Sequence, residues 1–168
     1  MSKTPSTHPL VIDSCIWIDL AKGGVLEEVF QLPHKIIDPD VLIQEEVRST
    51  NLEKLVNLGL NLIPASSENV EEVSRINNSK INISFYDASA LELANRMNGV
   101  LLTDDGQLIK TAREYSVQVE GVTWLLNELA THRCISGPKA ITALERINQS
   151  GHTIRDEEIE SWKERWTE

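Results

Sequence analysis

Acidic residues end several short apolar runs of the sequence, and this placement is suited to holding a metal ion. Asp13 follows residues 10–12, Asp38 follows 35–37, and Asp104 and Asp105 follow 100–103. If the runs are parallel strands, their carboxyl ends share the sheet edge at which α/β proteins place their functional crevice. Carboxylates gathered there raise one another's pKa, a cost that a bound cation offsets.

Further acids lie in the first turns of predicted helices, and each has a structural alternative. Ser84 and Asp87 have the spacing of a capping box, in which Asp87 would only satisfy backbone N–H groups. Asp40, Asp104 and Asp105 can likewise cap helices, and Glu45 and Glu46 can form a solvated helix face. A strand-end carboxylate such as Asp13 is less easily explained this way, since a buried charge needs a partner.

The ligand types favour one class of metal. Carboxylate oxygens suit Mg²⁺ or Mn²⁺ better than zinc. The four histidines lie apart in the sequence without metal-ligand spacing: His8, His34, His132 and His152. The sequence also has no GxGxxG, GxxxxGK[ST] or GxSxG motif, so it does not predict a phosphate-binding loop or a serine hydrolase.

The elements that position these acids alternate along the chain. Short runs rich in branched residues predict strands at 10–12, 35–37, 61–63, 100–102 and 117–119. Between them, periodic patterns predict helices at about 41–58, 68–78, 85–97, 106–115 and 122–131, with Asp40 opening the first and Asn98-Gly99 closing the third. This alternation predicts an α/β fold with a doubly wound, mainly parallel sheet.

A helical tail follows. Residues 138–148 and 156–166 read as two helices, so we predict one domain over 1–131 and a helical C-terminal extension over 132–168 packed on it. Ile159, Trp162 and Trp166 recur at helical spacing and form one apolar face. That face packs either on the chain itself or on a partner.

Length and composition limit the classes of function. A chain of 168 residues can bury a core without disulfides, and its two cysteines, Cys15 and Cys134, form no disulfide framework. The formal charge of −10 argues against nucleic-acid binding through a broad basic face. The first ten residues lack a signal-peptide pattern and no segment predicts a membrane span, so we expect a cytoplasmic protein with no membrane partner.

Four segments together resemble the PIN-domain nucleases. Val11 to Leu20 resembles the opening strand-and-Asp motif, and Asp40 to Val47 resembles the helix with the second acid. Ser84 to Ala88, with Leu91 and Ala94, resembles the third-acid helix, and Leu101 to Leu108 contains the closing T-x-D motif. The motifs occur in the family's order over residues 10–125.

The resemblance implies a set of site residues. Asp13, Glu46, Asp87 and Asp105 would be the catalytic, metal-binding quartet, and Asp104 would add a ligand. Glu46 matches the family pattern better than Glu45 because it directly precedes Val47. The hydroxyl groups of Ser14 and Thr103 would line the site. The implied cofactor is Mg²⁺ or Mn²⁺.

The same resemblance implies partners. The chain is similar to VapC-like toxins, which are ribonucleases silenced by a cognate antitoxin. RNA would then be the substrate, an antitoxin protein would be a partner, and a homodimer is compatible with the family. The tail from 132 to 168 departs from the plain toxin pattern.

Two other classes of protein are alternatives to the nuclease: phosphoryl-transfer domains and a non-catalytic module. Receiver and haloacid-dehalogenase domains also place Asp at strand ends, but the first needs a lysine after a late strand, where this chain has Glu120-Gly121. The second needs Asp two positions after Asp13, and residue 15 is cysteine. The alternative from another class is a non-catalytic PIN-like module that binds RNA or protein without cutting.

Overall fold

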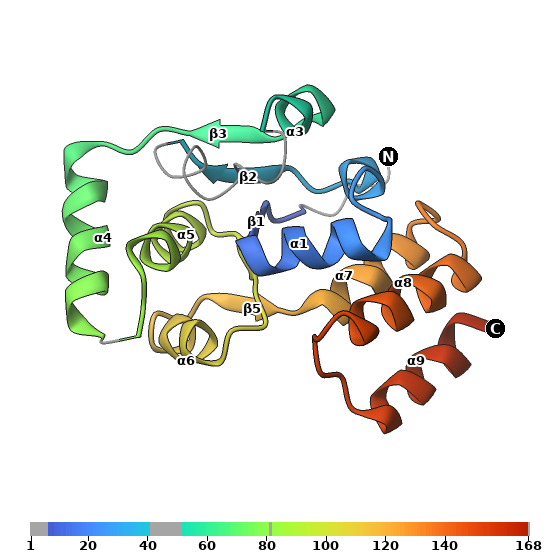
Figure 1. The fold of residues 1–168 in the computed structure, drawn as a ribbon. Coiled ribbons are helices and arrows are strands. Elements are labelled where there is room, and N and C mark those ends of the chain that lie inside the picture. The colour runs from blue at the N-terminus through green and yellow to red at the C-terminus, as the bar shows by residue number, and fades with distance from the viewer. Residues whose placement is uncertain (1–6, 41–51, 81, 168) are drawn as a thin grey trace, which may run out of the picture.

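A five-stranded, all-parallel sheet forms the centre of the molecule, with strand order β3-β2-β1-β4-β5 (Figure 1). The computed structural model describes residues 7–40, 52–80 and 82–167. Helices cover both faces of the sheet, which confirms the predicted doubly wound α/β fold. The strands are β1 Leu10–Ile12, β2 Ile36–Pro39, β3 Asn61–Ile63, β4 Val100–Leu102 and β5 Gln118–Glu120.

The central strand β1 explains why the fold has two apolar layers. All three of its residues are fully buried, and successive side chains of a strand point to opposite faces. Leu10 and Ile12 belong to the core under α1, α7 and α8. Val11 belongs to the core under α4, α5 and α6. A strand buried on both faces reads as a continuous apolar run, which is why its position could be predicted.

The helices alternate with the strands, and those predicted lie within a few residues of their expected ends. The predicted helix over 41–58 is described only from residue 52, so its start after Asp40 lies outside the described residues. No described helix has the length and apolar character needed to cross a membrane. The helices are α1 Ser14–Gly23, the 3₁₀ helix η1 Glu28–Gln31, α3 Leu52–Leu58, α4 Ser67–Ser79, α5 Phe85–Arg96, α6 Gly106–Glu114, α7 Val122–Thr131, α8 Gly137–Gln149 and α9 Asp156–Thr167.

Helix α1 is the main element that the sequence did not predict. Asp13 caps its N-terminus, and Gly24, with a φ of 75°, ends it in the left-handed conformation that glycine adopts without strain. Ile16, Trp17 and Leu20 form its buried face. The helix starts directly at the end of β1, so it holds Asp13 at the sheet edge.

The C-terminal helices pack on the rest of the chain. Helix α8 lies against α1, where a Cβ atom on Gly23 would stand 3.2 Å from Ile147 Cδ1. Ile159 and Trp166 of α9 are buried, and Trp166 Nε1 donates a hydrogen bond to Asn127 Oδ1 on α7 (3.2 Å). The apolar face of α9 therefore contacts the chain's own helices. The division of the chain at residue 131 stays a prediction.

Candidate active site

Asp13 lies at the carboxyl end of β1 and is held from three sides. Its Oδ1 accepts a hydrogen bond from the Ser14 N–H (2.8 Å). Its Oδ2 accepts from Thr103 Oγ1 (2.8 Å) and Cys15 Sγ (3.1 Å). The side chain is buried, and the bond to Thr103 joins the ends of the neighbouring strands β1 and β4. The carboxylate is thus fixed in position at the edge of the sheet.

Cys15 does not compete for the chemistry of this site. Burial, together with the negative charge of Asp13, raises the pKa of the Cys15 thiol to about 12. The thiolate is the nucleophilic form of cysteine, and a thiol with this pKa stays protonated at neutral pH. Cys15 therefore serves as a hydrogen-bond donor to Asp13.

Asp105 is coupled to Asp13 through Thr103. Its own N–H donates a hydrogen bond to Thr103 Oγ1 (3.1 Å), while the Thr103 hydroxyl donates to Asp13. Asp105 Oδ1 also accepts from the Leu108 N–H (2.9 Å), which makes Asp105 the N-cap of α6. One buried hydroxyl thus connects two of the predicted acids, and Ser14 and Thr103 both lie beside Asp13.

Asp87 has the helix-capping role considered from the sequence, and its role as a metal ligand stays a prediction. It forms the predicted capping box with Ser84, in which its Oδ2 accepts from the Ser84 N–H (3.2 Å). Burial raises the pKa of Asp87, and the negative charges of Asp13 and Asp105 raise it further. Those two charges therefore act on Asp87, and the sharing of one metal ion by the three acids stays a prediction.

Asp104 is oriented differently from its neighbour Asp105. Its Oδ2 accepts from the Val122 N–H at the start of α7 (3.1 Å) and lies 3.7 Å from His152 Nε2. His152 Nδ1 in turn lies 2.7 Å from Asp19 Oδ2. Burial raises the pKa of Asp104, as do the charges of Asp19 and Glu158. Asp104 thus contacts the start of α7 and His152 in the C-terminal segment, and its role as a ligand with Asp13 stays a prediction.

Glu45 and Glu46 lie outside the described residues. The position of the fourth predicted acid therefore rests on the sequence. The cations that the sequence places near the motifs, Lys22, Lys110 and Arg113, are exposed.

Asp38 also lies at the carboxyl end of its strand, as the sequence predicts, although the family resemblance does not include it among the metal ligands. It is fully buried in β2, and its Oδ2 accepts from Trp17 Nε1 (3.2 Å). Its Oδ1 has no hydrogen-bond partner among the residues that the structure describes. Burial and the charge of Asp13 raise the pKa of Asp38 well above its ordinary value. In the sequence, Asp38 directly follows the apolar residues Ile36 and Ile37, just as Asp13 follows the apolar strand β1. This pattern is the signal that could assign Asp38 to the site.

These observations fit a hard divalent cation. Burial and the charge of Asp13 raise the pKa of both Asp87 and Asp38, and one buried oxygen of Asp38 lacks a partner among the described residues. Oxygen donors of this kind are the ligands that Mg²⁺ and Mn²⁺ prefer. The residues present can therefore hold the predicted cofactor.

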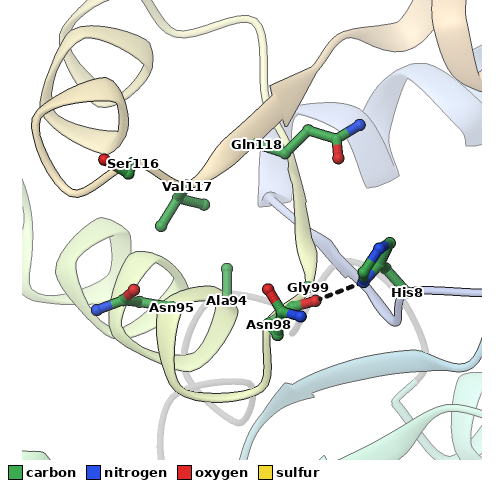
Figure 2. A pocket seen from close by; sticks show the side chains of 8 residues that line it. All are labelled: His8, Ala94, Asn95, Asn98, Gly99, Ser116, Val117 and Gln118. Atoms are coloured by element: carbon green, nitrogen blue, oxygen red, sulfur yellow. Dashed lines mark hydrogen bonds between the residues drawn. The ribbon is translucent and has the colours of Figure 1, made fainter.

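A pocket at the other edge of the sheet has a different character (Figure 2). Its lining includes His8 and Gly99, which lie just before β1 and β4, and Gln118, the first residue of β5, and it contains no Asp or Glu. Asp13 and Asp105 instead follow β1 and β4, and Asp38 lies in the carboxyl half of β2, so these acids are at the opposite ends of the strands. The pocket therefore does not belong to the acidic site.

The raised pKa of Asp87 predicts a pH-dependent stability. A folded carboxyl group with a raised pKa binds more protons than in the unfolded chain, so its contribution to the free energy of unfolding falls as pH rises through the folded pKa. Asp87→Asn removes the carboxyl group that ionises, and with it this loss of stability at higher pH. In EDTA, the variant should melt close to wild type near pH 4 and a few degrees above it at neutral pH, at about 2–4 °C per kcal/mol.

The capping role of Asp87 does not obscure this result. Asn69 occupies the equivalent position in α4 and forms the same capping box with Ser66. Asparagine at position 87 can therefore keep the cap. Thermal denaturation followed by circular dichroism checks the prediction, and a difference that does not change with pH would contradict it.

A family model described as PIN domain matches residues 9–168, including the C-terminal helices. Among solved structures, the chain is similar to a PilT N-terminus domain protein, SSO1118, from the archaeon Sulfolobus solfataricus. The two share 17% identity with a TM-score of 0.49, and the match covers 73% of this chain and 92% of the other. No curated protein matches the chain.

Proposed function

Because the chain belongs to the PIN domain family, whose members are generally nucleases, we propose that it is a metal-dependent endoribonuclease. The observation that supports the proposal is that the Thr103 hydroxyl joins Asp13 to the N–H of Asp105 at the ends of β1 and β4, while the charges of both acids add to burial in raising the pKa of Asp87. The three acids come from separate parts of the chain, and each also takes part in a helix cap: Asp13 in that of α1, Asp87 in that of α5 and Asp105 in that of α6.

The proposed division of labour follows from the contacts. Asp13, Asp87, Asp105 and Glu46 would hold the cation, with Thr103 positioning the first and third of these through its hydroxyl. A divalent cation bound there supplies activation of water and stabilisation of charge at the phosphate. The chain's own contribution is to fix the carboxylates rigidly, since Asp13 and Asp105 are each held by backbone N–H donors.

RNA must be attracted by groups near the site and not by the net charge of the molecule. The chain has a net charge of −10, so a general electrostatic pull on RNA is excluded, and the cation would bind the scissile phosphate directly. Exposed Lys22, at the end of α1, and Lys110 and Arg113, on α6, are proposed to contact flanking phosphates. This arrangement favours contacts with a few phosphates beside the cleaved bond over contacts along a long stretch of RNA.

A cleavage assay tests the proposal. Purified protein is incubated with end-labelled single-stranded RNA, structured RNA and DNA of the same sequence, with Mg²⁺, Mn²⁺ or EDTA. We expect internal cleavage of RNA that requires the metal and stops in EDTA. RNA that is bound but never cut in Mn²⁺ would support the non-catalytic module instead.

The finer proposal is that the enzyme is the toxin of a toxin–antitoxin pair. It rests on the resemblance to VapC-like toxins and on the acidic charge, which suits a basic segment of an antitoxin. Expression of the chain alone should slow growth, and co-expression of the neighbouring small gene should restore it. Equal growth of cells expressing wild type and an inactive variant would contradict the toxin role.

A further inference from the structure

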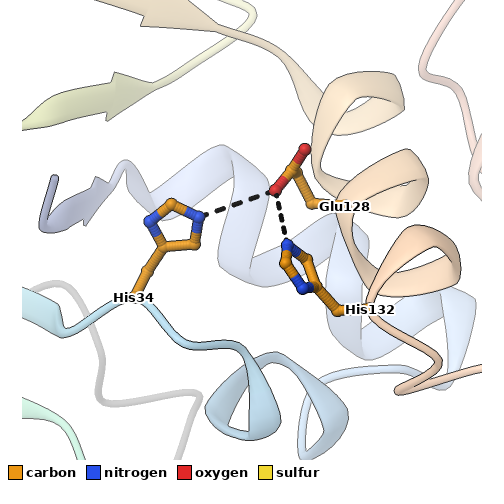
Figure 3. A group of neighbouring side chains, drawn as sticks. All are labelled: His34, Glu128 and His132. Atoms are coloured by element: carbon orange, nitrogen blue, oxygen red, sulfur yellow. Dashed lines mark ion pairs between the residues drawn. The ribbon is translucent and has the colours of Figure 1, made fainter. Parts of the chain in front are cut away.

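Two histidines and a glutamate from distant parts of the sequence meet on the side of the molecule covered by α7 (Figure 3). His34 precedes β2, Glu128 lies on α7, and His132 follows one turn later as the C-cap of that helix. Glu128 Oε2 lies 3.6 Å from His34 Nε2 and 3.3 Å from His132 Nε2. A single carboxylate oxygen thus faces both rings. The spacing rule applied to the sequence did not detect this group, because His34 approaches α7 only in the folded chain.

The distances match those of a metal centre. One ligand atom from each side chain lies within 4.8 Å of the other two. Zinc bonds to imidazole nitrogen and carboxylate oxygen are about 2.0–2.1 Å long, so tetrahedral ligands stand about 3.3–3.4 Å from one another. The two Oε2–Nε2 distances bracket that value, and an ion could enter with only small movements of the side chains.

A hydrogen bond to the backbone prepares His34 for binding. Its Nδ1 lies 2.9 Å from the carbonyl oxygen of His8. A carbonyl oxygen only accepts, so Nδ1 carries the proton and, in the neutral ring, Nε2 presents its lone pair toward Glu128. Metal-binding histidines typically make this second contact, which fixes their tautomer and orientation.

The surroundings leave one side of the group open. The His34 side chain is 12% exposed and that of Glu128 is 21% exposed, whereas that of His132 is 39% exposed. Within the described ranges, no lysine or arginine forms an ion pair with Glu128; the nitrogen groups within 4.0 Å of its carboxylate there are the two imidazole rings. The carboxylate is therefore partly desolvated and would gain from a cation, and a fourth ligand can approach past His132.

We propose that His34, Glu128 and His132 form a binding site for a zinc-type divalent transition metal. Two imidazoles and one carboxylate suit zinc and its neighbours, and they do not suit Mg²⁺, which prefers oxygen ligands. The site is separate from the acidic one, since His34 is tied to His8 before β1 and Asp13 follows β1. A bound ion would fasten the segment before β2 to α7.

Zinc binding by the full chain tests the proposal. Protein stripped of metal is dialysed against Zn²⁺ in excess Mg²⁺, which occupies the acidic site. We expect one tightly bound Zn²⁺ per chain and, with Co²⁺ in its place, a visible absorption band typical of tetrahedral nitrogen and oxygen ligands. Zinc at about 100 times its dissociation constant should raise the melting temperature by about 5–10 °C.

Matched variants assign the ion. Glu128→Gln and His132→Gln should weaken zinc binding by more than about 100-fold, since losing even an outer contact to a ligand costs 10–100-fold. His152→Gln, in the group with Asp19 and Asp104, and Asp13→Asn should keep it. Circular dichroism and the metal-free melting temperature verify that each variant is folded.

The opposite results overturn the assignment. Zinc binding that is unchanged in folded His132→Gln and Glu128→Gln would place the ion elsewhere. Zinc binding that is lost in His152→Gln or Asp13→Asn instead would assign it to those groups. A wild-type chain that binds no Zn²⁺ in dialysis would leave the three residues as a simple ion-paired cluster.

Discussion

Asp13→Asn is expected to reduce RNA cleavage by at least about 10³-fold while the chain stays folded. Asparagine keeps the shape of the side chain, and its Oδ1 can still accept the Ser14 N–H that Asp13 now accepts. What it lacks is the negative charge that retains a cation. Because that charge matters to metal binding more than to the fold, activity and stability should separate in this variant.

Asp105→Asn should behave in the same way. Asparagine is as good an N-cap as aspartate, so α6 should remain intact after the change. Cleavage rates with Mn²⁺ and melting temperatures in EDTA, measured on the same preparations, check both variants. EDTA added to wild type should reproduce their loss of activity.

A buried carboxylate elsewhere provides the control. Glu92 on α5 is buried and forms an ion pair with Arg96 (2.9 Å). Glu92→Gln also removes one buried negative charge, but it should leave cleavage within a few-fold of wild type. Cleavage that persists unchanged in Asp13→Asn would indicate a contaminating nuclease or a different site.

The sheet could be predicted because each strand carries its own signal. The triplets at 10–12 and 100–102 are wholly apolar and buried on both faces, so neither tertiary context nor pairing order is needed to recognise them. Helix α1 gave a weaker signal. Asp13 ends a strand and caps the helix at once, and the run from Cys15 to Ile18 is apolar without a break, so its helical period is hard to see.

The positions of the acids could be predicted from the sequence only where the ends of paired strands determine them. Asp13 and Asp105 follow strands that pair directly, and parallel strands bring such residues to one edge. The direction of Asp104 could not be predicted, because it depends on His152, which also pairs with Asp19 across a separation of 133 residues. The strand end predicted the place of Asp38, but its bond to Trp17 could not be predicted because it requires the unpredicted helix α1.

Glu46→Gln should lose cleavage by about the same factor as Asp13→Asn, at least about 10³-fold, whereas Glu45→Gln should stay within a few-fold of wild type. The two residues are adjacent and chemically identical. The sequence predicts a helix over 41–58, and neighbours on a helix point about 100° apart, so only one of the two can point toward Asp13. The family pattern favours Glu46 because it precedes Val47.

Comparing Glu45→Gln with Glu46→Gln isolates the direction in which each side chain points. Each variant removes one charge from the same segment, so changes in net charge, solubility or helix propensity are equal, and a difference in cleavage must come from the site. Cleavage by both variants is measured with limiting and saturating Mn²⁺, because loss of a ligand should be partly restored by excess metal. A large loss in Glu45→Gln with normal activity in Glu46→Gln would transfer the fourth ligand to Glu45 and shift the register of the resemblance by one residue.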